Sequence, residues 1–317
     1  MAILVTGCAG FIGSHVSRAL LEAGETVVGI DNLNDYYNPA WKQENLDGLA
    51  NFEKFTFMKG DITDVAFLES ITSDQPFTSI VHLAARAGVR PSIEQPVLYT
   101  QVNVQGTVHM LDFAVKRGVP QFVFASSSSV YGNQTKVPFS ESDPANDPIS
   151  PYAATKKAGE MLCKTYAHLY GIQTTCLRFF TVYGPGGRPD MAPYLFTDAL
   201  FNERPIHQFG DGSTQRDYTF IDDIVQGVVA AIHTPKPFAI YNLGNNQTVS
   251  LRDFIATLER VSGMTAQIVI EDPKPGDVPL TYADISKAQA ELGYEPTTNI
   301  EAGLSQFVEW YREFRLE

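Results

Sequence analysis

The stretch Ala2-Ile3-Leu4-Val5-Thr6-Gly7-Cys8-Ala9-Gly10-Phe11-Ile12-Gly13 decides the fold of this 317-residue chain. Its first five residues form an apolar run typical of a buried strand, and an amphipathic segment to Glu22 follows the glycines. Glycines between a strand and a helix let the backbone approach a pyrophosphate, and the helix start offers free N–H groups. A tight turn without a ligand is the plainer alternative. The residues that we expect to contact a dinucleotide here are Gly7, Gly10, Phe11, Ile12 and Gly13.

Further apolar runs repeat the strand pattern along the chain. They are Thr26 to Ile30, Phe55 to Met58, Ser79 to Leu83, Gln121 to Ser126, Thr174 to Arg178 and Ile240 to Leu243. Their alternation with helical segments predicts an α/β fold, a doubly wound parallel sheet of the Rossmann type, with a smaller mixed C-terminal lobe that binds substrate. A change to glycine- and proline-rich sequence after residue 178 marks a domain crossing. We expect a dinucleotide-binding domain of residues 1–178 plus 219–247 and a second lobe of residues 179–218 plus 248–317.

Asp31 stands at the end of the second predicted strand, 18 residues after Gly13. In dinucleotide-binding folds an acid near this position accepts hydrogen bonds from the adenosine ribose. Its charge would repel a 2′-phosphate, so the sequence favours NAD over NADP. An acid at a strand end is also common as a solvated turn residue.

Tyr152 and Lys156 lie four residues apart, in a segment that begins with Ser150-Pro151 and ends at Gly171. Serine is a good N-cap, proline suits the first turn, and glycine often ends a helix, so we expect a helix here. At this spacing the two side chains share one helix face. A nearby ammonium favours phenolate, so Tyr152 could exchange a proton with a substrate hydroxyl near neutral pH. An accidental pair is the alternative for an isolated motif.

Two other segments follow predicted strands and should meet this helix at the carboxyl edge of the sheet. Ser127, Ser128 and Ser129 form a hydroxyl cluster after the fifth strand. Small residues after the fourth strand allow close passage of a cofactor, with Arg86 or Arg90 available for anions. The segment from Gln101 to Arg117 is expected to be one scaffold helix. Its predicted buried stripe consists of Val102, Val108, Leu111 and Val115.

The composition excludes several classes of function. There are 36 acidic and 23 basic side chains, which argues against a nucleic-acid partner. Neither the three cysteines nor the six histidines show ligand spacing, so we expect no metal site, and reduced thiols indicate the cytoplasm. No apolar run approaches the roughly 20 residues of a membrane-spanning helix, and no signal peptide precedes the first strand.

Together these motifs resemble the extended short-chain dehydrogenase/reductase family of nucleotide-sugar enzymes, and among them the UDP-glucuronate 4-epimerases. The resemblance covers essentially the whole chain. It rests on the glycine turn and on five further segments in order: residues 31–37 (DNLNDYY), 84–90 (AARAGVR), 126–132 (SSSSVYG), 178–185 (RFFTVYGP) and 188–192 (RPDMA).

The resemblance implies tightly held NAD that is reduced and reoxidised in each turnover through a 4-keto sugar. Tyr152 would be the proton acceptor, Lys156 would hold the cofactor ribose and lower the phenol pKa, and Ser127 would bind O4. Further implied cofactor contacts are Asp31, Asn32, Asp61, Ile62, Leu83, Ala84, Ala85, Arg86, Asn103 and Phe179. Implied substrate contacts are Arg90, Ser127, Ser128, Ser129, Thr181 and Arg188, with Arg216 and Lys274 facing the UDP pyrophosphate and Asp277 its ribose. A homodimer through the Gln101 to Arg117 and Tyr152 helices is also implied.

Two alternatives remain open from the sequence. A decarboxylase or 4,6-dehydratase could use the same scaffold, although related lyases carry an acid just before Val130-Tyr131-Gly132 where this chain has Ser128 and Ser129. Hydroxyls cannot act as a base for the C5 proton at neutral pH. A non-catalytic dinucleotide sensor is disfavoured because the proton-transfer set Ser127, Tyr152 and Lys156 is present.

Overall fold

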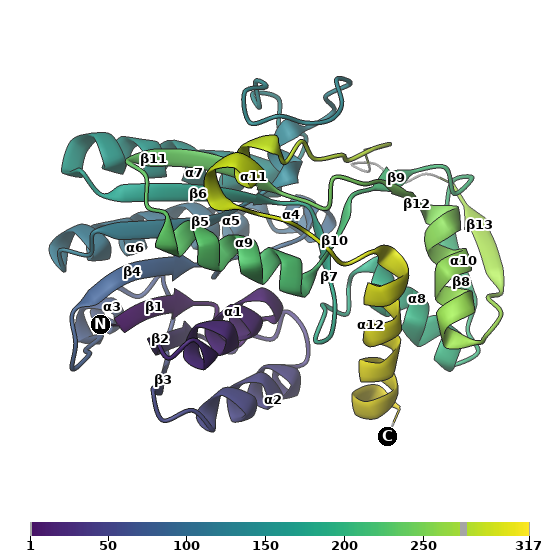
Figure 1. The fold of residues 1–317 in the computed structure, drawn as a ribbon, viewed down its shortest axis with the longest axis horizontal. Coiled ribbons are helices and arrows are strands. Elements are labelled where there is room, and N and C mark those ends of the chain that lie inside the picture. The colour runs from purple at the N-terminus through teal and green to yellow at the C-terminus, as the bar shows by residue number, and fades with distance from the viewer. Residues whose placement is uncertain (1, 273–277, 317) are drawn as a thin grey trace.

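The computed structural model describes residues 2–272 and 278–316. Its centre is a seven-stranded sheet in which every pairing is parallel, in the order β11-β6-β5-β4-β1-β2-β3 (Figure 1). The strands are β1 (Ala2–Thr6), β2 (Thr26–Asp31), β3 (Phe55–Lys59), β4 (Phe77–His82), β5 (Gln121–Ser127), β6 (Gln173–Phe179) and β11 (Phe238–Leu243). The order reverses beside β1, as in a doubly wound sheet, and this confirms the predicted Rossmann fold.

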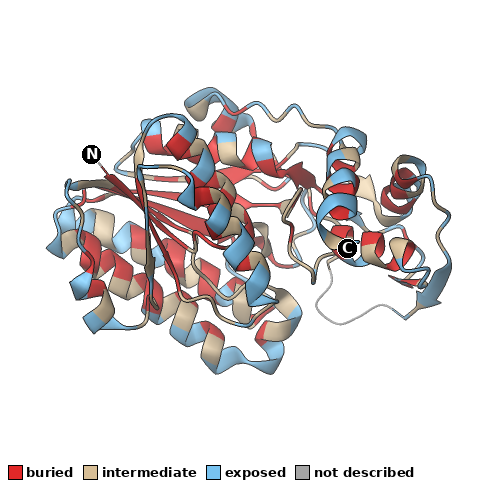
Figure 2. Cartoon of the chain, turned by 90° about the horizontal axis from the view of Figure 1, so that it is seen from below, coloured by how far each residue is buried: buried red, intermediate tan, exposed pale blue. Residues whose placement is uncertain are grey.

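Helices cover both faces of this sheet, so its inner strands are buried on both sides, whereas no residue of the edge strand β3 is fully buried (Figure 2). One apolar core joins the sheet to α1 (Phe11–Glu22), α2 (Pro39–Ala50), α9 (Ile221–His233) and α11 (Ser286–Leu292). The other joins it to α3 (Val65–Ser70), α6 (Gly106–Lys116) and α7 (Pro151–Tyr170). Between the fourth strand and α6 lie the short helices α4 (Val89–Glu94) and α5 (Pro96–Thr100).

A smaller group of elements lies at one end of the sheet, to the right in Figure 1. It contains α8 (Ala192–Phe201), α10 (Leu251–Ser262) and α12 (Ile300–Arg315). Short strand pairs accompany them: β7 (Thr181–Tyr183) with β10 (Tyr218–Phe220), β8 (Ile206–Phe209) with β13 (Ile268–Glu271), and β9 (Gln215–Arg216) with β12 (Val249–Ser250). Aromatic side chains such as Phe220 and Phe254 build a core of their own here.

The helix expected from Gln101 to Arg117 is divided, and its predicted stripe is largely wrong. Residues Gln101–Gln105 form a π-helical turn before α6, which inserts one extra residue and rotates the following face. As a result Val102, Val108 and Val115 are only half-buried, while Leu111 is buried as expected. Asn103 faces inward instead and is 2% exposed.

The predicted helix that carries Tyr152 is confirmed as α7. The Ser150 hydroxyl accepts a hydrogen bond from the Ala153 N–H, Pro151 lies in the first turn, and Gly171 ends the helix with φ of 70°. These caps fix the start of the helix and therefore which of its residues face the sheet edge. Within the described ranges, no helix has the length and apolarity needed to cross a bilayer.

Candidate active site

A cavity of about 1720 Å³ lies at the carboxyl ends of the sheet strands and extends beneath the smaller group of elements. It brings together nearly all the site residues expected from the sequence. Its lining includes Gly7, Gly10, Phe11, Ile12, Gly13, Asp31, Asn32, Asp61, Ile62, Leu83, Ala84, Ala85, Arg86, Arg90, Ser127, Ser128, Ser129, Tyr152, Lys156, Phe179, Thr181, Arg188 and Arg216. Asn103 is not part of this lining. Lys274 and Asp277 lie outside the described residues.

The glycine turn leaves the start of α1 free for an anion. Gly7 has φ of 73°, and a Cβ on Gly13 would lie 2.0 Å from the Gly7 carbonyl oxygen, so neither position accepts a side chain. A Cβ on Gly10 would meet only that same oxygen, at 3.3 Å, and would otherwise occupy the cavity. Unlike α7, α10 and α12, α1 has no side-chain N-cap. The N–H groups of its first turn therefore fit the pyrophosphate of a dinucleotide.

Asp31 occupies the place expected for an acceptor of ribose hydroxyls. It is 8% exposed, and its Oδ1 accepts a hydrogen bond from the Leu33 N–H at 2.8 Å. The Lys42 ammonium, which α2 carries into the same cavity, lies 3.7 Å from this oxygen. Burial lowers the pKa of Lys42, and the Asp31 charge opposes that shift. The ribose end of the site thus has both a carboxylate and a cation.

A hydrogen-bonded frame holds the loops on either side of the cofactor groove. Asn32 donates to Asp61 at 2.7 Å, and Thr63 donates to the same carboxylate. Burial alone would raise the pKa of Asp61, but these hydrogen bonds outweigh it and the pKa is lowered. Asn103 holds the Arg86 backbone at the edge of this groove. Its amide oxygen accepts a hydrogen bond from the Arg86 N–H, and its amide nitrogen donates to the Arg86 carbonyl and to the Thr155 hydroxyl on α7.

Tyr152, Lys156 and Ser127 converge where β5 meets the start of α7. The Lys156 ammonium donates to the Ala125 carbonyl at 2.7 Å and lies 5.9 Å from the centre of the Tyr152 ring. Ser127 accepts hydrogen bonds from the N–H and hydroxyl of Ser129. A proton acceptor, a cation and a hydroxyl donor therefore share one corner of the cavity, as proton exchange with an alcohol requires.

The electrostatics of Tyr152 differ from the expectation that Lys156 lowers its pKa. Burial raises the pKa of Tyr152, and the influences that oppose this are a hydrogen bond with Ser127 and the charge of Arg188. The Lys156 ammonium is directed at the Ala125 carbonyl, and burial lowers the pKa of Lys156 to about 8. The charge of Arg188 therefore favours the phenolate in this structure.

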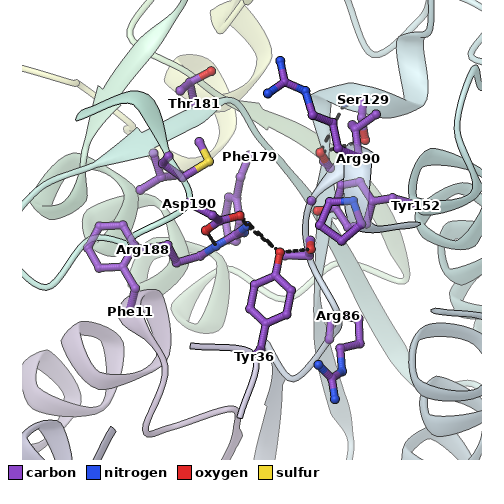
Figure 3. A pocket seen from close by; sticks show the side chains of 18 of the residues that line it. Phe11, Tyr36, Arg86, Arg90, Ser129, Tyr152, Phe179, Thr181, Arg188 and Asp190 are labelled. Carbon is purple, nitrogen blue, oxygen red and sulfur yellow. Dashed lines mark hydrogen bonds and ion pairs between the residues drawn. The ribbon is translucent and has the colours of Figure 1, made fainter. Parts of the chain in front are cut away.

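Arg188 does not stand alone in the cavity. Its guanidinium pairs with both oxygens of Asp190 and lies beside the Tyr36 ring (Figure 3). Burial would raise the pKa of Asp190, but the Arg188 charge lowers it. Thr181 lies above this pair in the same view, and Arg90 lies on the opposite side, beside Tyr152 and Ser129. The Arg90 guanidinium is 5.2 Å from the centre of the Phe209 ring.

The cavity residues that escaped the sequence reading include three polar side chains that make hydrogen bonds or ion pairs in the site: Tyr36, Lys42 and Asp190. Tyr36 and Asp190 belong to segments that carried the family resemblance, but no local pattern assigned them a role. Lys42 lies on α2, which was not expected as a helix. The available signal was the spacing of Lys42, Leu46 and Leu49. Lys42 lies four residues before Leu46, and this spacing places it on the same buried face of the helix as the two leucines.

Comparison with known proteins agrees with this geometry. Residues 4–307 match the model of the family described as GDP-mannose 4,6 dehydratase. UDP-glucuronate 4-epimerase 4 of Arabidopsis thaliana is 46% identical, over 99% of this chain and 76% of the relative.

Solved structures point the same way. The crystal structure of UDP-glucuronic acid 4-epimerase from Bacillus cereus in complex with UDP-glucuronic acid and NAD is 36% identical, covers 99% of both chains and superposes with a TM-score of 0.91. DesIV, a dTDP-glucose 4,6-dehydratase from Streptomyces venezuelae with NAD bound, is 31% identical, with a TM-score of 0.92 over 99% of this chain and 98% of that one. The chain therefore belongs to the extended short-chain dehydrogenase/reductase family, in the group that includes the UDP-glucuronate 4-epimerases.

Proposed function

We propose that this protein is an NAD-dependent UDP-glucuronate 4-epimerase that forms UDP-galacturonate through a transient 4-keto sugar. The observation that carries the proposal is that one cavity joins an uncapped, glycine-lined helix start to Tyr152, Lys156 and Ser127. The named relatives support the substrate class.

The side chains divide the work as follows. Tyr152, as phenolate, takes the proton of the sugar 4-hydroxyl and later returns it, while Ser127 donates a hydrogen bond to O4. A bound NAD would supply the acceptor for the C4 hydride and its source on return to the other face of the 4-keto sugar. Lys156 has ammonium protons beyond the one given to Ala125, and these suit the hydroxyls of the cofactor ribose.

The substrate must be held at both ends while its sugar turns over. Arg188, Thr181, Ser128 and Ser129 offer donors for the sugar carboxylate. At the nucleotide end, Arg216 lines the cavity from β9 and suits the pyrophosphate. Our assignments of Lys274 to the pyrophosphate and Asp277 to the uridine ribose remain proposals from the family resemblance.

A lyase is the second candidate, because the matched family model and DesIV carry dehydratase names. Oxidation of a uronate at C4 makes a β-keto acid and also acidifies the proton at C5. Elimination removes that proton, so it needs a base near C5. Ser128 and Ser129 cannot supply one. The acid Asp190 does line the cavity, but its oxygens accept from Arg188 and Tyr36 and its pKa is lowered. A carboxylate so engaged is a poor base, which favours epimerisation.

The direct experiment incubates the purified protein with UDP-glucuronate without added cofactor and separates the sugar nucleotides. We expect UDP-galacturonate to accumulate to an equilibrium mixture. Release of carbon dioxide with a UDP-pentose would identify a decarboxylase, and a UDP-4-keto-6-deoxy sugar from a neutral UDP-hexose would identify a dehydratase. No conversion, even with NAD supplied, would contradict both readings.

We also propose that the chain divides into the two parts expected from the sequence, residues 1–178 plus 219–247 and residues 179–218 plus 248–317. The return of β11 to the main sheet and the separate core around Phe254 support this division. Cofactor contacts then come mainly from the first part, and Arg188 and Arg216 come from the second.

A cytoplasmic homodimer completes the proposal. The three cysteines are free and buried, which suits a reducing compartment. The short helices α4 and α5 pack against α7, and this group carries large exposed apolar side chains, Ile93, Val97 and Met161. Such side chains fit an interface between copies of the chain.

A further inference from the structure

The Arg188 guanidinium is held on one side only. Its Nε donates to Oδ1 of Asp190 at 2.9 Å, and its Nη2 donates to Oδ2 of the same residue. Nη2 also donates to the Tyr36 hydroxyl at 3.3 Å. Across residues 2–272 and 278–316, Arg188 Nη1 donates no hydrogen bond, because those of the side chain come from Nε and Nη2. Two N–H groups of Arg188 are therefore available to a ligand in the cavity that this residue lines.

Tyr36 connects this pair to the cofactor side of the groove. Its hydroxyl lies 2.7 Å from the Ala87 carbonyl oxygen and 3.1 Å from Oδ2 of Asp190. Gly88 has φ of 99°, and a Cβ there would lie 2.8 Å from the Tyr36 hydroxyl, so the backbone makes room for this contact. Loops that follow β2, β4 and β7 thus meet at one cluster, formed by Tyr36, Arg188 and Asp190 (Figure 3).

The geometry distinguishes two roles for Asp190. If Asp190 occupied the position of a substrate carboxylate, it would have to leave before Arg188 could bind the sugar. Because it uses Nε and Nη2, a second carboxylate can approach Nη1 while the first pair stays in place. A bidentate pair also fixes the plane of the guanidinium, which reduces the conformational entropy lost when a ligand binds.

We propose that Asp190 and Tyr36 are positioning residues that hold Arg188 with Nη1 presented to the carboxylate of the sugar. This inference rests on the proposed function, since it assumes a uronate substrate. Held in this way, the Arg188 guanidinium also lies near Tyr152, and its positive charge favours the phenolate. The cluster then links recognition of the carboxylate to the proton acceptor and, through Tyr36, to the loop that follows Asp31.

The test compares binding of UDP-glucuronate and UDP by calorimetry in the NAD-loaded wild type, Asp190→Asn, Asp190→Glu and Tyr36→Phe. UDP has no carboxylate, so it reports on folding and on the nucleotide subsite alone. Glu301→Gln is the matched control, because it breaks the exposed ion pair with Arg260.

We expect Asp190→Asn to weaken UDP-glucuronate binding by about fivefold or more, as for coupled neighbouring charges, and to leave UDP binding within about twofold. Asp190→Glu should restore most of the loss, Tyr36→Phe should show a smaller one, and Glu301→Gln should bind both ligands like the wild type. In steady-state kinetics with UDP-glucuronate, Asp190→Asn should mainly raise KM and change kcat much less.

Equal or tighter binding of UDP-glucuronate by Asp190→Asn would overturn the positioning role, as would a parallel loss of UDP binding. A wild type that epimerises UDP-glucuronate while Asp190→Asn binds it normally refutes this inference alone. A wild type that neither converts UDP-glucuronate nor binds it more tightly than UDP refutes the proposed function, and this inference with it.

Discussion

Tyr152 lies in surroundings that favour its neutral form, although a general base must be deprotonated at the working pH. Burial raises its pKa, and Ser127 and Arg188 oppose that shift. A cationic nicotinamide bound beside the phenol would add to the same opposing influence. The phenol is therefore suited to accept a proton when both cofactor and substrate are in place.

Replacing Tyr152 with phenylalanine should lower kcat by about 10²-fold or more, because the reaction loses its general base. The variant should still bind NAD and UDP, since both contacts depend mainly on other residues. Stopped assays of UDP-galacturonate formation, with the NAD content of the purified variant as control, measure this. Turnover close to that of the wild type would remove Tyr152 from the mechanism.

The pair of Asp31 and Lys42 should set the preference for NAD. Asp31→Ala removes the charge that repels a 2′-phosphate and leaves the Lys42 cation in the cavity, so NADP should bind markedly better. The double variant Asp31→Ala with Lys42→Met should lose that gain. Reconstitution of cofactor-stripped protein with either dinucleotide measures the ratio. An unchanged ratio in Asp31→Ala would show that Asp31 does not face the ribose.

Local spacing was enough to predict that Tyr152, Lys156 and the serine cluster lie close together, since helix geometry and the end of a strand place them there, and the family resemblance singled out Ser127. The same reasoning could not find Tyr36 or Asp190. Asp190 is only two residues from Arg188, but no local pattern gave it a role. Tyr36 is 152 residues from Arg188, and only tertiary folding brings it to this pair. The sequence analysis also assigned the lowering of the Tyr152 pKa to Lys156, because helix spacing shows that these two residues are neighbours. The sequence does not show that Arg188 acts on Tyr152 as well.

A buried ion pair joins helix α7 to strand β6 one turn after Lys156. Glu160, one turn after Lys156 on α7, accepts from Nε and Nη2 of Arg178 on β6 at 2.7 and 2.8 Å, and from the Ser126 hydroxyl at 2.7 Å. Both charged side chains are at most 2% exposed. Removing one partner leaves the other charge buried without compensation.

Glu160→Gln should therefore lower the free energy of unfolding by about 3 kcal/mol at pH 7. Burial would raise the pKa of Glu160, but Arg178 and Ser126 outweigh it and the pKa is lowered. A carboxylate with a lowered pKa stabilises the fold above its unfolded value and loses this contribution as the pH falls through its folded value. The difference between wild type and variant should thus shrink below about pH 4.5. Urea unfolding from pH 7 to pH 3.5 measures it, and a constant difference would contradict the assignment.

Strands were predictable because continuous apolar runs such as Ala2–Thr6 are needed wherever a parallel sheet is covered on both faces. Helix α2 was missed because only Leu46, Leu49 and the stem of Lys42 are buried on it, too few to form a visible stripe. The π-helical turn at Gln101–Gln105 shifted the buried face of the next helix, since a one-residue insertion changes the periodicity on which such a prediction depends.

The oligomeric state is a property of the whole molecule, and mutation of the proposed dimer interface tests it. Val97→Glu combined with Met161→Glu should convert the proposed dimer to a monomer, because charges would be buried at the interface. Phe314→Glu on α12 is a matched control, since Phe314 is 52% exposed and Met161 is 54% exposed. Light scattering after size exclusion gives the mass. A wild type that is monomeric, or a dimer unaffected by the double change, would contradict the proposed interface.

The arrangement of the two parts around one cavity explains how a sugar can turn over without being lost. In the proposed mechanism, Arg216 of the smaller part holds the nucleotide end and Arg188 holds the carboxylate, whereas the proton acceptor and the cofactor groove belong to the part that contains the main sheet. Oxidation and reduction at C4 then take place in one binding event, with no net change of the cofactor.

UDP-glucuronate carrying deuterium at C4 tests this claim most directly. If the same hydride leaves C4 and returns to it within the cavity, the UDP-galacturonate that forms should keep the deuterium at C4, with none released to water and a slowed conversion compared with unlabelled substrate. Product that has lost the label to solvent, as detected by mass spectrometry and NMR, would contradict the account.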